Sequence, residues 1–547
     1  MLLLLPLSCS VLSTFAVALA AQHTTIVDLG YARYQGTVNK ASGNLEFLGI
    51  RYAAAPTGAL RWREPQHPQS TPGVQLANSF PNICWQGAPS TQLVSPFRQS
   101  GSNHFRRQIP GAPPPSEDCL FLNIATPSSG KGDLPVVVWI HGGGYVVGST
   151  FMFDGDDLIR QAGGQAVVVI IQYRLGLFGF LSSQKVKNGG ALNAGLLDQQ
   201  FALQWVQQHI SKFGGDPKKV TIWGESAGAG SVLQHLIANN GNTQPPLFRG
   251  AITGSTFLPS QYVFNDRIPE QLYAEAVEQS GCSSSADDLD CLRQADIDAL
   301  NRINLNLTGS AFFGTACLNP VVDGTLITKR PIELIHEGKV NRAAYLAVTN
   351  QFEGWYPGFV DNRTADTVQT PEYLANIFPE FTDKQITAGT AVYANQGPPL
   401  DQARAIMGDS IFICPTYYLL RAFKGEAFKG EFAIAPAFHG DDIVYYFPTP
   451  LIVSSAIAGV TPPYNNSEFI NNFSQSFMNF VLYQDPNVKW DSSNTVPHWP
   501  RWNEDNLAEI VFNRTEEGEP VFHTVETTAD QLRRCDYWQS VGPFSGQ

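Results

Sequence analysis

Residues 218–228 read KKVTIWGESAG, in which an apolar segment leads directly into the pentapeptide GESAG at residues 224–228. This Gly-x-Ser-x-Gly pattern is typical of a sharp turn between a strand and a helix that presents a serine side chain, and its glycines permit the turn. The pattern also occurs in ordinary turns, so its surroundings decide the interpretation. Residues 227–237 (AGAGSVLQHLI) continue with the small and apolar side chains of a packed helix. We therefore predict that Ser226 is a nucleophile for acyl transfer.

Three further apolar segments predict buried strands. Residues 134–140 (LPVVVWI), 166–173 (AVVVIIQY) and 249–253 (RGAIT) lack the polar alternation of a half-exposed strand. Residues 196–210 (LLDQQFALQWVQQHI) lie between two of them and have the apolar spacing of a helix. This alternation predicts an α/β fold with a large, mostly parallel central sheet that helices flank.

A run of three glycines at residues 142–144 follows the first of these strands directly, within the segment HGGGY. Ligands gather at the carboxyl ends of parallel strands, so this run and Ser226 are expected to meet in space. Backbone N–H groups stabilise the oxyanion of an acyl-transfer intermediate, and glycine lets the main chain come close. We assign Gly143, Gly144 and Ala227 to such an oxyanion hole. The alternative is that the glycines form only a flexible turn.

The composition limits the classes of function. The chain has 547 residues, 43% of them hydrophobic, with no internal repeat and no long low-complexity linker, so residues 21–547 are expected to form one domain. A formal net charge of −13 disfavours binding to nucleic acid or to an anionic membrane surface. No CxxC, HExxH or phosphate-loop motif is present, so we expect no metal and no cofactor. The expected partner is a neutral small molecule, and the oligomeric state stays open.

The first twenty residues, MLLLLPLSCSVLSTFAVALA, form an apolar segment that ends in a small-residue pattern typical of signal-peptide cleavage. A retained membrane anchor is the alternative, but Pro6 and three serines interrupt the segment, and no other stretch is long and apolar enough to span a bilayer. We therefore predict a secreted, extracellular protein. Five Asn-x-Ser/Thr sequons are candidate glycan sites in that compartment: Asn306, Asn362, Asn465, Asn472 and Asn513.

Several longer segments resemble the type-B carboxylesterase and lipase family of the α/β-hydrolase fold, which includes fungal lipases and cholinesterases. They are the HGGG segment and residues 117–127 (EDCLFLNIATP), 173–181 (YRLGLFGFL), 193–202 (NAGLLDQQFA) and 213–228 (FGGDPKKVTIWGESAG). The resemblance implies a hydrolase of neutral carboxylic esters, with lipid or sterol esters at a lipid interface among the candidate substrates. A catalytically inactive adhesion protein of the same fold and an amidase are the alternatives.

In this fold the chain order is serine, acid, histidine, so the histidine is expected to follow Ser226. His439, within AFHGDD (437–442), resembles the family's catalytic histidine. It would act as general base and then protonate the leaving alcohol. Glu353, within NQFEG (350–354), resembles the family's glutamate before glycine, and Asp361 is its nearest rival.

Three other carboxyls lie beside these residues in the sequence. Asp441 and Asp442 are better explained as a solvated loop face, or as charges at the start of a helix, than as the acid of the site. Glu225 precedes Ser226 directly, and we expect it to tune the electrostatics of the site, with a surface position as the alternative.

Seven cysteines follow the predicted signal segment, in a compartment that favours disulfides, so at least one cysteine is unpaired or intermolecular. The resemblance implies three disulfides: Cys84–Cys119, Cys282–Cys291 and Cys414–Cys535. Cys317 is then left as a free, buried thiol.

The loop between Cys84 and Cys119 is expected to overhang the site and to influence the choice of substrate. Residues 86–118 lack the helical hydrophobic stripe of a lipase lid, and whether such a lid exists stays open. Trp85 lies next to Cys84 rather than deep in the loop, which argues against recognition of choline by cation–π attraction. Five aromatic residues are candidates for an apolar acyl pocket, with simple core packing as the alternative: Phe312, Phe313, Phe352, Trp355 and Tyr356.

Overall fold

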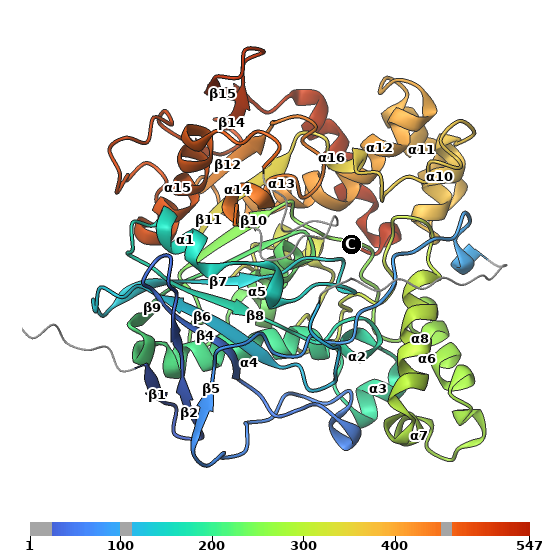
Figure 1. The fold of residues 1–547 in the computed structure, drawn as a ribbon. Helices are drawn as coiled ribbons and strands as arrows, with labels where there is room; N and C mark the ends of the chain where they lie inside the picture. The colour runs from blue at the N-terminus through green and yellow to red at the C-terminus, as the bar shows by residue number, and fades with distance from the viewer. Residues whose placement is uncertain (1–24, 99–111, 450–461) are drawn as a thin grey trace, which may run out of the picture.

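The computed structural model describes residues 25–98, 112–449 and 462–547; the predicted signal segment and part of the Cys84–Cys119 loop lie outside these ranges. A twelve-stranded sheet runs through the middle of the molecule (Figure 1). Its strands are β3 (Thr37–Val38), β4 (Leu45–Arg51), β6 (Phe121–Thr126), β7 (Leu134–Ile140), β8 (Val167–Ile171), β9 (Gly215–Glu225), β10 (Gly250–Gly254), β11 (Ala344–Asn350), β12 (Ala427–Phe432), β13 (Arg501–Trp502), β14 (Ala508–Arg514) and β15 (Pro520–Glu526).

The strand order is β15-β14-β12-β11-β10-β9-β7-β8-β6-β4-β3, and β13 pairs with β12. The central strands, from β8 through β7, β9, β10, β11 and β12 to β14, pair in parallel. The outer strands pair antiparallel. A separate small sheet consists of β1 (Ile26–Asp28), β2 (Arg33–Gln35) and β5 (Val74–Leu76). The predicted α/β sheet is thus confirmed, with its parallel part at the centre.

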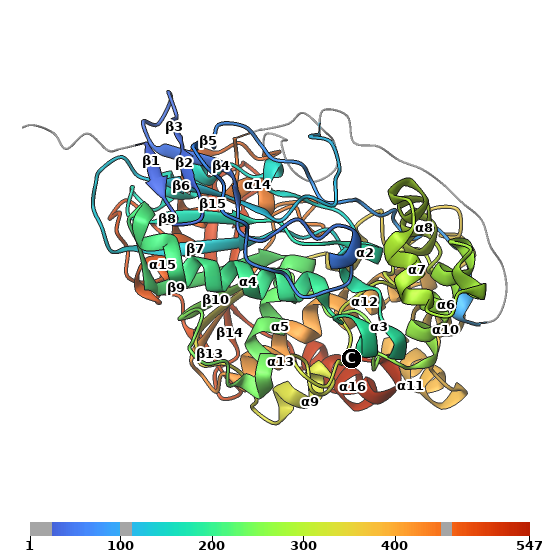
Figure 2. The ribbon, with the colours of Figure 1, turned by 90° about the horizontal axis from the view of Figure 1, so that it is seen from below.

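Helices pack on both faces of the sheet, as Figures 1 and 2 show. On one face lie α4 (Ala194–His209), α5 (Ala227–Gly241), α13 (Cys414–Ala422) and α16 (Ala529–Ser545). On the other lie α1 (Gly155–Gln161), α14 (Ile443–Tyr446) and α15 (Ser467–Tyr483). The remaining helices are α2 (Gly176–Phe180), α3 (Gln184–Gly189), α6 (Arg267–Gln279), α7 (Asp288–Gln294), α8 (Ile297–Gly309), α9 (Pro331–His336), α10 (Thr370–Ile377), α11 (Asp383–Tyr393) and α12 (Pro399–Gly408). None of the helices within the described ranges has the length and apolarity needed to cross a membrane.

Strand β7 shows why the apolar segments of the sequence become central strands. Side chains alternate between the two faces of a strand, and here both faces are covered. Val136, Val138 and Ile140 belong to the core on the α4 and α5 side. Val137 and Trp139 belong to the core on the α15 side. Because every position from Val136 to Ile140 is buried, the strand needs a continuous apolar run rather than an alternating one.

The structure contains the three expected disulfides. Cys84–Cys119 closes the loop before β6, Cys282–Cys291 closes a short loop that leads into α7, and Cys414–Cys535 joins α13 to α16. Within the described residues, Cys317 is the free cysteine, and the residue as a whole is partly rather than fully buried. Burial raises the pKa of its thiol to about 12.

One predicted glycan site is wrong. Asn472 lies in the middle of α15 with only 3% of its surface exposed, and its side-chain oxygen accepts a hydrogen bond from the backbone N–H of Thr495 at 2.6 Å. A bulky glycan has no room at a buried, hydrogen-bonded asparagine. Asn362 and Asn465 are exposed, whereas Asn306 and Asn513 are partly buried, so these four sequons stay candidates.

Candidate active site

Ser226 occupies a sharp turn between β9, which ends at Glu225, and α5, which begins at Ala227. Its φ of 56° and ψ of −127° are strained for a residue with a side chain, and such strain is typical of functional positions. The flanking glycines are required by close contacts. A Cβ on Gly224 would lie 2.3 Å from the carbonyl carbon of Gly228, and one on Gly228 would lie 2.0 Å from the carbonyl oxygen of Ile140. The sequence therefore folds here as the strand–turn–helix that the motif predicts.

His439 and Glu353 lie beside this serine because β9, β11 and β12 end at the same edge of the sheet. Nε2 of His439 is 2.8 Å from Oγ of Ser226, and Nδ1 is 2.7 Å from Oε2 of Glu353. A carboxylate only accepts hydrogen bonds, so Nδ1 carries the proton and Nε2 is free to accept one from the serine hydroxyl. The other carboxylate oxygen of Glu353 accepts a hydrogen bond from the backbone N–H of Asn350 at 2.8 Å. Ser226 and His439 are each 8% exposed and Glu353 is 1% exposed.

Two further carboxyls are buried beside Ser226, His439 and Glu353. Burial raises the pKa of Glu225 to about 8, and Oε1 of Glu225 is 3.5 Å from Nε2 of His439. Burial also raises the pKa of Asp442 to about 6, and Asn350 donates a hydrogen bond to it at 3.0 Å. The expectation that Asp442 is solvated is therefore wrong, although it does precede α14. Its carboxylate lies against the last residues of β10 and β11, since a Cβ on Gly254 would be 3.4 Å from Oδ2 of Asp442.

The neighbouring carboxyls and burial have opposite effects on the pKa of the His439 imidazole. Burial lowers the pKa of His439, but the neighbouring carboxyls of Glu225 and Glu353 raise it by more, so the net pKa lies above its ordinary value. His141, which begins the glycine run, lacks such neighbours. Burial lowers its pKa to about 4, and its neutral ring stacks on Tyr173.

The glycine run lies directly against the serine turn. A Cβ on Gly142 would lie 2.6 Å from the carbonyl oxygen of Glu225 and 3.0 Å from Cβ of Ser226. Gly143 and Gly144 have φ of +105° and +62°, and both are free of backbone acceptors for their N–H groups in the described part of the chain. Ala227 is the first residue of α5, where the N–H groups point out of the helix. The glycine run and the start of α5 therefore adjoin Ser226, and the N–H groups of Gly143 and Gly144 have no backbone acceptor among the described residues.

Two phenylalanines enclose the imidazole. The ring centroid of Phe412 is 4.2 Å from that of His439, and the centroid of Phe359 is 5.2 Å away. The two phenylalanine rings also contact each other. The sequence analysis did not identify either residue. The chain has 34 phenylalanines, and nothing in the sequence around these two indicates a contact with the histidine.

A cavity of about 50 Å³ lies beyond Phe412, on the side away from the imidazole of His439, with one layer of side chains between Phe412 and the cavity. Phe257 and Ile411 form part of its wall, and Phe257 packs against Phe412 with ring centroids 5.6 Å apart. The rest of the wall is mostly apolar and includes Phe97, Ala311, Cys317, Ile377 and Met407. None of the five aromatic residues considered from the sequence lines this cavity; Phe312 instead packs against Tyr373.

One acidic cluster in the described residues has oxygens close enough to share an ion. Oxygens of Glu46, Asp154 and Asp156 lie within 4.8 Å of one another, on β4 and at the start of α1. Asn44 and Ser42 donate hydrogen bonds to Asp156, and Asn39 donates one to Glu46 at 2.6 Å. The cluster is thus explained by hydrogen bonds that the protein itself supplies.

A serine on a strand–turn–helix, a histidine and a carboxylate at the carboxyl edge of a parallel sheet define the class of α/β-hydrolases. A sequence model of the carboxylesterase family matches residues 23–538, so the chain belongs to the carboxylesterase family. It is similar to the secreted triacylglycerol lipase LIP1 of Gibberella zeae, with 30% identity over 85% of this chain and 83% of that protein. It is 32% identical to the liver carboxylesterase of Sus scrofa, over 89% of each chain. The crystal structure of Aspergillus niger EstA superposes with a TM-score of 0.80 and 29% identity, covering 96% of this chain and 99% of that one.

Proposed function

We propose that the chain is a secreted hydrolase of neutral carboxylic esters that works through Ser226, His439 and Glu353. The observation that carries the proposal is that one imidazole contacts both partners. Its Nε2 is 2.8 Å from the serine oxygen and its Nδ1 is 2.7 Å from the carboxylate. This is the geometry that a general base requires before a substrate arrives.

His439 moves one proton through each half of the reaction. Nε2 accepts the hydroxyl proton as Oγ of Ser226 attacks the ester carbonyl, and Glu353 stabilises the imidazolium that forms. The imidazolium then gives this proton to the alcohol oxygen as the C–O bond breaks, which leaves an acyl group on Ser226. Water enters next and gives its proton to Nε2. When the acyl–oxygen bond breaks, Oγ takes the proton back and the carboxylic acid leaves.

The oxyanion of each tetrahedral intermediate is assigned to the N–H groups of Gly143, Gly144 and Ala227. Preorganised donors in a site with little water stabilise such a charge without reorganising during the reaction. Both glycines have positive φ, and neither N–H has a backbone acceptor among the described residues, which supports this role. Every proton transfer in the proposed reaction uses a side chain already in place, so we expect no cofactor.

The cavity beyond Phe412 supports an apolar acyl group as the part of the substrate that is recognised. Its wall is built largely from apolar side chains, and it begins one ring away from the imidazole. Similarity to a relative named as a triacylglycerol lipase makes esters at a lipid interface candidates as well. Three disulfides support an extracellular location, where they persist. N-terminal sequencing of the secreted protein tests the expected start after residue 20.

The test is turnover of p-nitrophenyl esters of increasing acyl length by the purified protein, with Ser226→Ala as the control and an anilide assayed in parallel. We expect ester hydrolysis that Ser226→Ala lowers by about 10⁴-fold or more. Absence of turnover by folded wild-type protein would favour an inactive binding protein of the same fold. Cleavage of the anilide alone would make the chain an amidase.

A further inference from the structure

The side chain that packs on His439 comes from an interrupted helix. Helix α12, a π turn (Asp409–Ile413) and α13 follow one another without a break in helical backbone, so residues 399–422 form one rod. The interruption has a cause in the sequence. Pro415 has no N–H to donate to the carbonyl of Ile411 and its ring crowds that carbonyl, so the helix widens. At the widened turn, the N–H of Cys414 bonds to the carbonyl of Asp409 instead of that of Ser410.

The two carbonyls that lose their helical partners bond to other parts of the chain. The backbone N–H of Leu258 donates to the carbonyl of Ile411 at 2.8 Å. The side-chain amide of Gln547 donates to the carbonyl of Ser410 at 2.7 Å. The turn is therefore held in one place by contacts from outside the rod.

The rod contacts His439 directly and also contacts the residue that follows Glu353. Phe412 places its ring 4.2 Å from the ring of His439. At the end of α12, the backbone of the rod passes so close to Gly354 that a Cβ there would lie 1.8 Å from the carbonyl oxygen of Arg404 and 2.6 Å from the nitrogen of Gly408. Gly354 directly follows Glu353 in the chain, so the same rod supports the histidine and the carboxylate.

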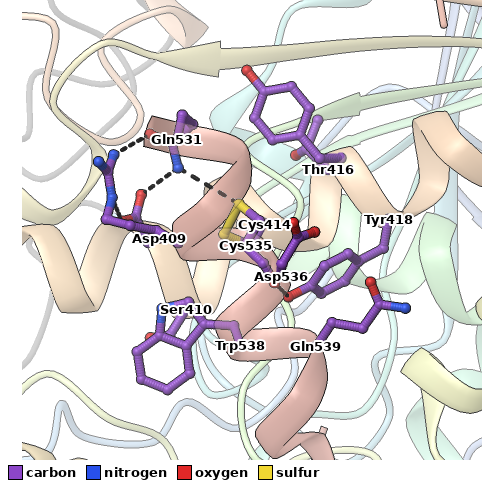
Figure 3. The surroundings of a disulfide bond; sticks show 12 residues. Asp409, Ser410, Cys414, Thr416, Tyr418, Gln531, Cys535, Asp536, Trp538 and Gln539 are labelled. Carbon is purple, nitrogen blue, oxygen red and sulfur yellow. Dashed lines mark hydrogen bonds and ion pairs between the residues drawn. A yellow bond between two sulfur atoms is a disulfide. The ribbon is translucent and has the colours of Figure 1, made fainter. Parts of the chain in front are cut away.

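Helix α16 anchors the π turn at its first residue and directly after its last. Arg534 pairs with Asp409 at 2.6 Å, and both side chains are nearly buried. Gln531 donates to the other oxygen of Asp409 at 2.7 Å, and the disulfide Cys414–Cys535 joins the two helices covalently. Figure 3 shows Asp409, Gln531 and the disulfide on one side of α16, with the rod lying alongside.

We propose that the π turn and the end of α12 that leads into it are the positioning element of the catalytic centre: α16 fixes the turn, the turn fixes His439 through Phe412, and the end of α12 fixes Glu353 through Gly354. Phe412 is accordingly a positioning residue rather than a catalytic one. This inference rests on the proposed function of Ser226, His439 and Glu353. A displacement of about 1 Å in a catalytic group costs up to about a hundredfold in rate, so such support has a measurable effect.

The first test compares Phe412→Leu with Phe423→Leu, a substitution of the same size directly after the rod, where Phe423 packs on Tyr345 away from the imidazole. The substrate is p-nitrophenyl acetate, whose acyl group is too short to fill the cavity, and an organophosphate titration counts reactive serines. We expect Phe412→Leu to lower kcat roughly tenfold and to leave KM within about twofold. Phe423→Leu is expected to lose comparable thermal stability and to keep its kcat. Equal kcat values for the two variants would overturn the proposal.

The second test removes the anchor. Replacing Cys414 and Cys535 together by alanine is expected to lower kcat for the acetate ester severalfold, whereas the same change at Cys282 and Cys291 is expected to leave kcat unchanged. A folded Cys414→Ala/Cys535→Ala variant with wild-type kcat would contradict the role of α16. If that variant does not fold, the Phe412 comparison decides alone. Failure of the proposed function itself is distinguishable, because wild-type protein would then show no turnover that depends on Ser226.

Discussion

Oε1 of Glu225 lies 3.5 Å from Nε2 of His439, the ring nitrogen that also contacts Oγ of Ser226. The same oxygen is buried and has no hydrogen-bond partner within the described residues. A buried, unpaired carboxyl is costly unless it interacts with a positive charge. The imidazolium that forms during acyl transfer is such a charge, so Glu225 and His439 are expected to titrate as a coupled pair.

Glu225→Gln is expected to move the acidic limb of the kcat/KM profile to lower pH. The general base must be neutral, but in the coupled pair the proton that Glu225 gives up can lie on the imidazole, where the resulting carboxylate charge stabilises it and raises the pKa of His439. Removing that charge lowers this pKa, so the base becomes available at lower pH. A pH–rate profile with a short ester checks the shift. Glu337→Gln, at an exposed ion pair with Lys329, is the control and is expected to leave the limb in place.

The same substitution is expected to stabilise the fold at alkaline pH. Burial raises the folded-state pKa of Glu225 from an ordinary value of 4.5 to about 8. Between these values the folded chain binds more protons than the unfolded chain, so stability is lost as pH rises through this interval. Glu225→Gln removes the loss, because its amide does not titrate. Thermal unfolding at pH 5 and pH 8.5 should show a Tm advantage of the variant that grows with pH; an advantage that is constant or shrinks would contradict the burial argument.

Gly143→Ala is expected to lower kcat by about 10²–10³-fold, the cost of losing one oxyanion donor. An added Cβ would lie 2.2 Å from the carbonyl oxygen of Val147, so the loop must shift and carry the N–H with it. Gly30→Ala is the matched control, since Gly30 also has positive φ, at +90°, but nothing lies within 4 Å of its Cβ position. Steady-state kinetics and thermal unfolding of both variants separate the lost donor from backbone strain.

Local motifs made much of this site predictable. The GESAG turn and the glycine run follow buried strands, and the need for glycine comes partly from local contacts, as at Gly224 and Gly143, and partly from the contact of the two motifs with each other. His439 and Glu353 were identified by chain order and by segments resembling the family. Their proximity depends on the parallel order β9-β10-β11-β12, in which all four strands end at the same edge of the sheet.

What the sequence could not predict depends on packing between distant segments. Asp442 lies in a loop whose sequence gives no sign of burial, and its contacts are with the distant ends of β10 and β11. The sequon at Asn472 is a valid triplet whose burial is decided by the packing of α15. One residue in the sequence indicates the π turn: Pro415, which lies within an apolar helical segment. The contact of the turn with the imidazole could not be predicted, because it depends on how the rod packs against the loop after β12.

Cys317 is expected to react slowly with thiol reagents in the native state. Burial raises its pKa to about 12, and the thiolate is the reactive form. After denaturation without reductant, a thiol titration of a chain that begins after residue 20 is expected to find one thiol. Finding three would contradict one of the disulfides, and fast reaction of the native protein would contradict the burial of the thiol.

Ala311→Leu is expected to shift the substrate preference towards shorter acyl chains. Ala311 is buried at the wall of the cavity of about 50 Å³, and three added carbons fill space that an acyl chain would otherwise occupy. Ile377, the last residue of α10, also lines this cavity. Ile377→Ala enlarges the cavity and is expected to favour longer acyl chains. The measurement is kcat/KM for p-nitrophenyl esters from acetate upward, with thermal unfolding as a check, because large-to-small core substitutions cost about 2–5 kcal/mol. Opposite shifts from the two variants, with acetate turnover retained in both, identify the cavity as the acyl site; parallel losses at every chain length would place the acyl group elsewhere.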